Sequence, residues 1–375
     1  MAEVQIAIFF ASVVLGIFNR IKRKAVKGRV QLANMNDSTS FDILVVGAGP
    51  AGSTAAYFLA TKYNLKVGLF DKKRFPRQKI CGDAWCAPAL KILEEMKVLE
   101  KMESDGIVHS VTRGGFISPF GYQCINSEGA TYGSVTGCKT YAIKRQIADK
   151  YLVDAATESV YCTFIEAEVS DAKLVSTSSI DGLNPDSADE HHWEVTAVQP
   201  GNISEGGGQL SYDASYRAKV LLICDGSTSY LGQKLGLVKA GSYSEAECSH
   251  SYVKGGSHQW TDADGVMVFT KSLLPGYSAL FRHFDGDMYL GTYLLPPTRA
   301  TSACIKPVEF ELIESHPYIR QAFGATYEWN QKQVVAPIRL GGIYRSYGKQ
   351  VLLVGDAAGQ VDSSPFPILS YSHLE

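Results

Sequence analysis

A glycine-rich run, Gly47-Ala48-Gly49-Pro50-Ala51-Gly52, carries the clearest chemical signal in the sequence. The first glycine of such a run permits a tight turn, the second lets the backbone approach a phosphate, and the third lets a helix pack closely on a strand. The unpaired N–H groups at the start of that helix can then bind phosphate oxygens. The run therefore predicts a site for the pyrophosphate of a dinucleotide.

The elements expected around this run support the same interpretation. Residues 42–46 (DILVV) form an apolar run typical of a strand buried on both faces, and residues 53–60 continue with a helical pattern. A second apolar strand over 66–70 ends at Asp71, whose carboxylate is well placed to accept hydrogen bonds from a ribose diol. Strand, helix, strand and acid in this order predict a dinucleotide-binding βαβ unit.

Three later segments fit a nucleotide site at the edge of the same parallel sheet. A helical segment at 141–152 contains Arg145. Apolar strands at 220–224 and 351–354 lead into Asp225-Gly226 and Gly355-Asp356. Because the carboxyl ends of parallel strands meet at one edge, we expect both aspartates to lie near the ligand.

This ordered set of motifs resembles that of the FAD-binding flavoproteins of the p-hydroxybenzoate hydroxylase type. More narrowly, residues 75–83 (FPRQKICGD), followed by Pro88-Ala89-Leu90, are similar to the geranylgeranyl reductase family. The resemblance runs from Phe41 to about residue 362. We expect an α/β fold with a discontinuous Rossmann-type FAD-binding domain at 41–236 and 345–365, and a mixed β-sheet substrate domain at 237–344.

The resemblance also implies an activity, in which NADPH reduces FAD and the flavin then reduces an isolated C=C bond of a prenyl lipid. The chain has a single GxGxxG run, so we expect the nicotinamide cofactor to bind only transiently. The expected cofactor-binding residues are Gly47, Gly49, Pro50, Ala51, Gly52, Asp71, Lys72, Cys81, Gly82, Arg145, Asp225, Gly226, Gly355, Asp356, Ala357 and Gly359.

Residues 275–281 (PGYSALF) are similar to the family's substrate-pocket motif, Tyr-x-Trp-x-Phe, with Ala279 where tryptophan is usual. Tyr277 and Phe281 alternate along the expected strand, so both would face one pocket as substrate-binding residues. The alternative is that they are ordinary core aromatics. No catalytic acid emerges from the isolated histidines, and the absence of a CxxC pair argues against a zinc site. These histidines include His109, His192, His250, His258 and His283.

Three alternative functions remain open. A flavin monooxygenase shares the same FAD motifs. The C-x4-C spacing of Cys81 and Cys86 occurs in flavin disulfide reductases, although their Gly-Gly-Thr lead-in and second GxGxxG run are missing. A truncated, non-catalytic relative is the third, because Pro365 and Pro367 would not continue a helix there. Residues 366–375 form an atypical tail where the family has its flavin-covering turn and C-terminal helices.

The N-terminal residues predict a membrane anchor. From Val4 to Phe18 only Gln5 and Ser12 are polar, and the basic residues all follow the apolar run. This order is unlike a cleaved secretory signal, and it places the remainder on the cytoplasmic side. We expect an anchor with a basic flank at 1–29, a linker at 30–40, and a catalytic body facing the cytoplasm from the endoplasmic reticulum or another endomembrane, with a plastid less favoured. An interfacial or protein-packed helix is the alternative.

The composition sets outer limits on the function. The 375 residues are 45% hydrophobic and 20% charged, which excludes a wholly disordered chain. A net charge of −2 argues against a primary nucleic-acid-binding role. Eight scattered cysteines are typical of thiols in a reducing compartment.

Overall fold

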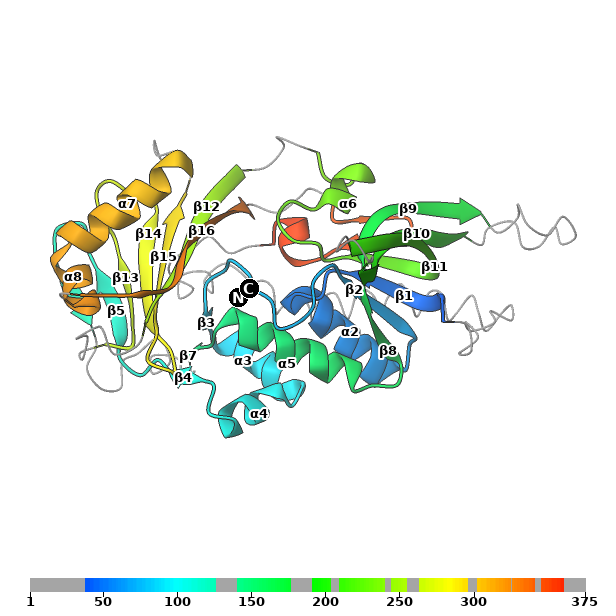
Figure 1. The fold of residues 1–375 in the computed structure, drawn as a ribbon, viewed down its shortest axis with the longest axis horizontal. Coiled ribbons are helices and arrows are strands. Elements are labelled where there is room, and N and C mark those ends of the chain that lie inside the picture. The colour runs from blue at the N-terminus through cyan, green and yellow to red at the C-terminus, as the bar shows by residue number, and fades with distance from the viewer. Residues whose placement is uncertain are drawn as a thin grey trace, which may run out of the picture.

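The structure is a computed structural model that describes residues 38–125, 140–176, 191–203, 209–239, 244–254, 263–295, 302–324, 326–340 and 345–360. Two large β-sheets lie at opposite ends of the molecule, with helices and a small third sheet between and around them (Figure 1).

The first sheet carries the glycine-rich turn. Eight described strands form it, and those in the order β18-β11-β1-β2-β8 run parallel to one another. Strands β9, β10 and β11 form an antiparallel meander. The bounds are β1 Ser40–Val46, β2 Val67–Asp71, β8 Cys162–Glu166, β9 Glu168–Ser176, β10 His191–Ile203, β11 Gln209–Ile223, β17 Tyr347–Gly348 and β18 Val351–Leu353.

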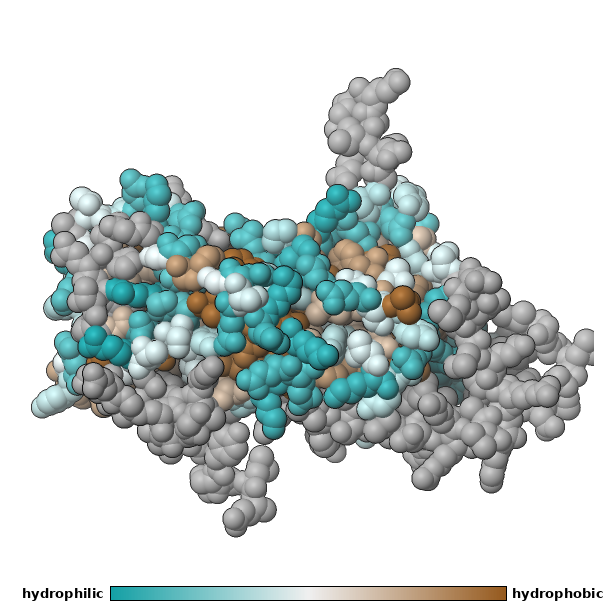
Figure 2. All heavy atoms as spheres, turned by 90° about the horizontal axis from the view of Figure 1, so that it is seen from below, coloured by the Kyte–Doolittle hydropathy of each residue, from teal (hydrophilic) through white to brown (hydrophobic). Residues whose placement is uncertain are grey.

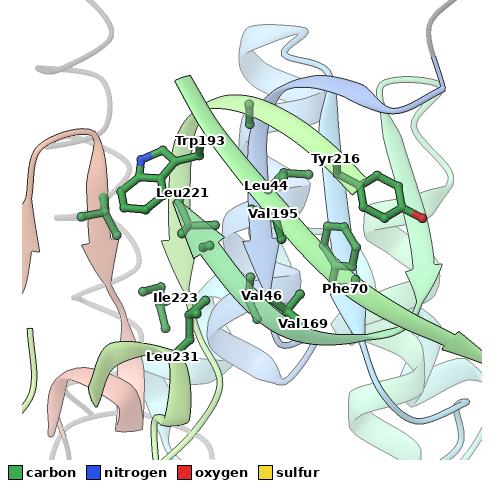
Figure 3. Packing of buried hydrophobic residues seen from close by; sticks show 14 of the residues in the cluster. Leu44, Val46, Phe70, Val169, Trp193, Val195, Tyr216, Leu221, Ile223 and Leu231 are labelled. Carbon is green, nitrogen blue, oxygen red and sulfur yellow. The ribbon is translucent and has the colours of Figure 1, made fainter. Parts of the chain in front are cut away.

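Strand β1 is buried on both faces because the meander covers one face and helices cover the other. Leu44 and Val46 pack with Trp193 of β10 in one apolar cluster (Figure 3). Ile43 and Val45 belong to a second cluster, to which helices α2 (Pro50–Tyr63) and α5 (Arg145–Thr157) contribute. The continuous apolar run in the sequence thus reflects burial on both sides, and the predicted α/β fold is confirmed.

The second sheet has one face packed against helices α7 (Ser302–Ser315) and α8 (Pro317–Phe323). Its seven described strands follow the order β16-β12-β15-β14-β13-β5-β6. The bounds are β5 Gly114–Ile117, β6 Gln123–Ile125, β12 Ser244–Val253, β13 Gly265–Val268, β14 Tyr277–Arg282, β15 Met288–Leu294 and β16 Trp329–Leu340.

The predicted domain boundaries need a correction here. Strands β5 and β6 lie within the segment 41–236 that the sequence assigns to the FAD-binding domain, yet β5 pairs in parallel with β13. Ile117, for example, lies opposite Val268. A parallel pairing between segments so far apart leaves no local sequence signal. The chain therefore enters the second sheet well before residue 237.

The small third sheet joins the two large sheets. It contains β3 (Ala84–Trp85), β7 (Tyr141–Ala142) and β4 (His109–Ser110), and helices α3 (Ala87–Glu95) and α4 (Val98–Ser104) pack nearby. Seen from the side of these helices, the described surface is mainly hydrophilic, with hydrophobic residues showing in the middle of the molecule (Figure 2).

The expected anchor at 1–29, most of the linker at 30–40 and the tail at 366–375 lie outside the described residues. In the part that the structure describes, no helix has the length and apolar character needed to cross a membrane.

Glu309 of helix α7 has a carboxyl group that is buried between this helix and the second sheet. Its Oε1 accepts a hydrogen bond from Ser249 Oγ at 3.0 Å, and its Oε2 contacts the Gln333 amide. Burial raises the pKa of Glu309 to about 8. Among the described residues, Gln333 Oε1 is buried without a partner. Turning this amide over would let a protonated Glu309 donate to that oxygen, which fits a neutral acid.

We expect Glu309 to make the protein less stable as the pH rises. A carboxyl whose folded pKa is about 8, against an ordinary 4.5, holds a proton that the unfolded chain releases. Stability is therefore lost across that window, at up to about 1.4 kcal/mol per pH unit. Glu309→Gln should flatten the profile of melting temperature against pH between about 5 and 8. Glu311→Gln, an exposed site on the same helix, is the control. An unchanged slope in Glu309→Gln would contradict a neutral Glu309.

Candidate functional site

A cleft of about 330 Å³ opens where the parallel strands of the first sheet end. Its walls come from the turn after β1, the end of β2, the segment after β11 and the segment after β18. Of the predicted cofactor-binding residues, the following line it: Gly47, Gly49, Pro50, Ala51, Asp71, Lys72, Arg145, Asp225, Gly226 and Asp356. Segments far apart in the sequence thus meet at the edge of the sheet where open α/β folds bind ligands.

The three glycines of the turn have different structural roles. Gly47 has a φ of +100°, and a Cβ there would lie 2.2 Å from the carbonyl oxygen of Cys224. A Cβ on Gly52 would lie 1.8 Å from the Gly47 carbonyl oxygen, so only glycine lets helix α2 approach its strand. A Cβ on Gly49 would have Arg77 Nη2 as its nearest neighbour, at 3.6 Å. Of the three, Gly49 is therefore the glycine that leaves room for a ligand in the cleft.

Asp71, at the end of β2, is turned back toward the glycine-rich turn. Its Oδ2 accepts a hydrogen bond from the Ala48 N–H at 3.1 Å, and its Oδ1 accepts one from the Lys73 N–H at 3.0 Å. Lys72, in contrast, is largely exposed and pairs with Glu168 at 2.9 Å. Asp71 thus ties the turn to β2 while it remains part of the cleft wall.

Two guanidinium groups line the same cleft and share one buried carboxylate. Arg145 Nε donates to Asp149 Oδ1 at 2.8 Å, and Arg77 Nη1 lies 3.6 Å from Asp149 Oδ2. Arg77 also pairs with Asp71 at 3.4 Å. Arg77 is not among the site residues predicted from the sequence. It lies in the 75–83 phrase that carries the family resemblance, but no spacing rule indicates that this arginine returns to the cleft.

The cleft offers hydrogen-bonding groups that suit an anionic dinucleotide. Within the described residues, Arg77 Nε is buried without a hydrogen-bond partner. Helix α2 begins at the cleft with Gly49 as its N-cap, which provides no side-chain hydrogen bond to the first turn. Such a helix start presents N–H groups and a positive dipole end to an anion. The residues present therefore fit the pyrophosphate and ribose of FAD.

The two predicted aspartates lie on the opposite wall. Asp225 Oδ2 accepts a hydrogen bond from the Leu231 N–H at 3.0 Å, and thus caps helix α6 (Tyr230–Lys234). Burial raises the pKa of Asp225. Asp356 Oδ2 accepts a hydrogen bond from Ser227 Oγ at 3.3 Å. These two hydrogen bonds hold the side chains of Asp225 and Asp356 in the wall of the cleft.

Gly355, Ala357 and Gly359 form or end a short 3₁₀ turn, η3 (Gly355–Ala358), and do not line the cleft. A Cβ on Gly355 would lie 2.9 Å from the Cβ of Ala51, which accounts for glycine at this close approach. Arg339, buried on β16 of the second sheet, donates to the Ala357 carbonyl oxygen at 2.6 Å. This bond connects the second sheet directly to the turn that carries Asp356.

Cys81 and Gly82 lie between the cleft and the second sheet. The Cys81 carbonyl oxygen is 3.0 Å from His250 Nδ1 on β12, and a Cβ on Gly82 would lie 2.8 Å from the hydroxyl of Tyr293 on β15. Neither residue lines the cleft itself. No disulfide bond joins Cys81 to Cys86.

Asp83, the next residue, is fully buried and joins both halves of the molecule. Its Oδ1 accepts a hydrogen bond from the Arg145 N–H at 3.2 Å, and its Oδ2 accepts one from the Tyr252 hydroxyl at 2.5 Å. His283 Nε2 lies 3.1 Å from the same Oδ2. Burial alone would raise the pKa of Asp83, but His283, His250 and Tyr252 outweigh it and lower that pKa.

The face of the second sheet turned toward Gly82 is aromatic. Tyr277 and Phe281 share this face, as predicted, and stack on Tyr293 at 4.8 Å and on Tyr289 at 5.7 Å between ring centroids. They do not line the cleft. The two β15 tyrosines are not among the predicted site residues, because a strand-like MYLGTYL run does not reveal which residues it will pack against. We call Tyr252, Tyr277, Phe281, Tyr289 and Tyr293 the aromatic face.

Comparison with known proteins gives relatives over most of the chain. The Thi4 family matches residues 23–111. Conditioned medium factor receptor 1 of Dictyostelium discoideum is 30% identical over 332 residues, or 88% of this chain, and the chain spans 60% of that protein's length. Digeranylgeranylglycerophospholipid reductase 1 of Methanopyrus kandleri is 27% identical over 86% of this chain and 74% of its own length. Menaquinone reductase of Mycobacterium tuberculosis is 26% identical over 88% of this chain and 72% of its own length.

Solved structures share the fold. A geranylgeranyl bacteriochlorophyll reductase-like protein from Thermoplasma acidophilum has a TM-score of 0.61 at 18% identity, covering 85% of this chain and 72% of its own. A flavin-dependent brominase has a TM-score of 0.62 at 17% identity, with the same coverage of both chains. Reductase and brominase thus share one architecture, and the fold does not decide between their reactions.

Replacing Arg77 should weaken FAD binding by roughly ten- to a hundredfold, because the loss of a charge-assisted hydrogen bond in a site costs about 1.5–3 kcal/mol. The measurement is a titration of the full chain with FAD, comparing wild type with Arg77→Ala. Arg74→Ala is the matched control, since Arg74 is exposed and pairs with Glu166 on the surface. A folded Arg77→Ala protein with wild-type affinity would show that Arg77 does not contact the cofactor.

The glycine-rich turn, the acid at the end of β2, and the two later aspartates all meet at one cleft. The reductases among the relatives extend over most of the same residues. The resemblance inferred from the sequence is therefore confirmed: the chain is similar to digeranylgeranylglycerophospholipid reductases, and it shares its fold with a geranylgeranyl bacteriochlorophyll reductase-like protein.

Proposed function

We propose that this protein uses FAD and NADPH to reduce C=C bonds in the prenyl chain of a lipid. The observation that carries the proposal is the aromatic face, which contacts the Cys81-Gly82 turn beside the dinucleotide cleft. A prenyl chain is apolar and unsaturated, and aromatic side chains supply apolar area of defined shape. The names of two relatives, a digeranylgeranylglycerophospholipid reductase and a menaquinone reductase, point to prenylated substrates.

The residues of this chain would divide the work. The turn after β1, Asp71 and Arg77 would hold the ADP half of FAD, and Asp225 and Asp356 would bound the opposite side. FAD, when bound, supplies the two-electron chemistry that amino-acid side chains lack. The aromatic face would exclude water and orient the prenyl chain. His250, whose pKa burial lowers, is neutral at physiological pH and would fix the Cys81-Gly82 turn through its ring N–H.

The N-terminal residues complete the proposal. The apolar stretch within residues 1–29 would anchor the protein in an endomembrane, with the catalytic body on the cytoplasmic side. A lipid substrate could then reach the aromatic face without leaving the bilayer completely.

A second function has some support from one comparison. The relative with 30% identity is described as a receptor, and the chain spans 60% of its length. A protein that keeps the cleft but does not turn over substrate would fit that description. The fold shared with a flavin-dependent brominase is also compatible with a monooxygenase-type reaction. The experiment below separates these possibilities.

The full chain is solubilised in detergent and supplied with FAD, NADPH and a geranylgeranylated glycerolipid. We expect it to reduce C=C bonds of the lipid under anaerobic conditions, with two hydrogen atoms added for each bond. The measurement is mass spectrometry of the lipid after anaerobic incubation. Tyr277→Ala should raise KM for the lipid several-fold, because the ring stacked on Tyr293 is lost, while Tyr347→Ala, an exposed residue of the first sheet, should not. Oxygen-dependent hydroxylation of the lipid would favour the monooxygenase. Bound FAD that NADPH does not reduce, with no change in the lipid, would favour the receptor-like protein.

A further inference from the structure

Two neighbouring segments at one end of the second sheet are unusually poor in charge. Residues 116–125 (FISPFGYQCI) and 267–277 (MVFTKSLLPGY) contain one charged side chain, Lys271, and no acid. The whole chain is 20% charged. The two segments share an end of the sheet because β5 and β13 run parallel, and the Phe269 N–H donates to the Ile117 carbonyl oxygen at 2.9 Å.

Three large apolar side chains project into solvent from these segments. Phe120 is 75% exposed, Tyr122 78% and Leu274 47%. The Lys271 ammonium lies 4.9 Å from the centroid of the Phe120 ring and so joins the two segments. We call Phe120, Tyr122, Lys271 and Leu274 the aromatic tip. It lies beyond β5, at the end of the molecule far from the dinucleotide-binding sheet (Figure 1).

The exposure is built into the turn. The Ser118 N–H donates to the Tyr122 carbonyl oxygen at 2.8 Å, and the Gly121 N–H donates to the Ser118 carbonyl oxygen at 3.0 Å. Ser118 Oγ accepts a further hydrogen bond from the Tyr122 N–H at 3.0 Å. Gly121 has a φ of +83°, a conformation that glycine adopts without strain. The hairpin thus holds both aromatic rings outward at its end.

The segment that carries Lys271 and Leu274 also contains Phe269 and Tyr277, whose aromatic contacts lead to the Gly82 turn. Phe269 lies 5.7 Å from Tyr277 between ring centroids, and Tyr277 stacks on Tyr293 at 4.8 Å. The Tyr293 hydroxyl lies beside Gly82. The segment 267–277 therefore carries part of the exposed tip and also contacts the aromatic face.

We propose that the aromatic tip enters the interfacial region of a lipid bilayer and sets the second sheet against the membrane, where a lipid's prenyl chain can pass to the aromatic face. Aromatic rings beside a lysine, without acids, are the side chains that settle among lipid headgroups. The lysine would meet phosphates while the rings reach the upper acyl chains. The route for substrate rests on the proposed reductase function, whereas the membrane contact does not.

The test needs a local signal, since the N-terminal segment could by itself bring every variant to a membrane. Phe120→Trp places a reporter at the tip, and Tyr212→Trp places one at a 55% exposed site on β11 of the first sheet. Full-length proteins are mixed with vesicles of phosphatidylcholine and phosphatidylserine that carry bromine on the upper acyl chains. Bromine quenches tryptophan on contact, and the signal of the wild-type protein, which has four tryptophans, is subtracted.

We expect the Phe120→Trp emission to shift to shorter wavelength and to be quenched, with no added quenching in Tyr212→Trp. A vesicle-bound Phe120→Trp protein without added quenching would overturn the proposal. A blue shift that appears without vesicles and grows with protein concentration would also overturn it, because it would assign the tip to a second copy of the chain. Neither readout needs turnover, so failure of the reductase assay would leave this result standing on its own.

Discussion

The buried carboxylate of Asp83 is the interaction on which the rest of the site depends. A desolvated charge is costly unless several donors surround it. Here the donors come from three parts of the chain: the Arg145 backbone at the start of α5, Tyr252 on β12, and His283 after β14. The Asp83 carboxylate makes all of these contacts only when the first sheet, the small sheet and the second sheet have one particular arrangement. The Cys81-Gly82 turn, immediately before Asp83, is placed by the same requirement.

A second bond joins the halves of the molecule on the other side of the cleft. Arg339 extends from β16 to the Ala357 carbonyl oxygen, within the turn that carries Asp356. The cleft and the aromatic face are thus positioned by two buried polar contacts rather than by the apolar clusters alone. Apolar packing is tolerant of small shifts, whereas a buried hydrogen bond to a charged group fixes direction as well as distance.

The sequence predicts the first half of this site well because the chemistry there is local. The Gly47–Gly52 turn, its flanking strand and helix, and Asp71 all follow one another, and Gly47 and Gly52 each have a steric reason to be glycine. The strands before Asp225 and Asp356 are recognisable for the same reason, since apolar runs that end in Asp and Gly are short-range signals. Tyr277 and Phe281 were placed on one face by strand alternation alone.

What the sequence does not predict depends on distant pairing. Arg77 lies in the segment after β2 and contacts both Asp71 and Asp149, the latter on the distant helix α5. Strand β5 joins the second sheet through β13, and no local pattern indicates that partner. His250 and His283 look isolated along the chain, yet Asp83 lies near both. These features depend on which segments meet in three dimensions.

The proposed chemistry requires that one FAD molecule binds in the cleft beside the Cys81-Gly82 turn. The most direct test is a titration of the full chain with FAD that is monitored through the flavin absorption band at about 450 nm. The account predicts saturation at one FAD per chain, with a band displaced from that of free FAD because the ring leaves water. A correctly folded chain that leaves the spectrum of FAD unchanged would contradict it.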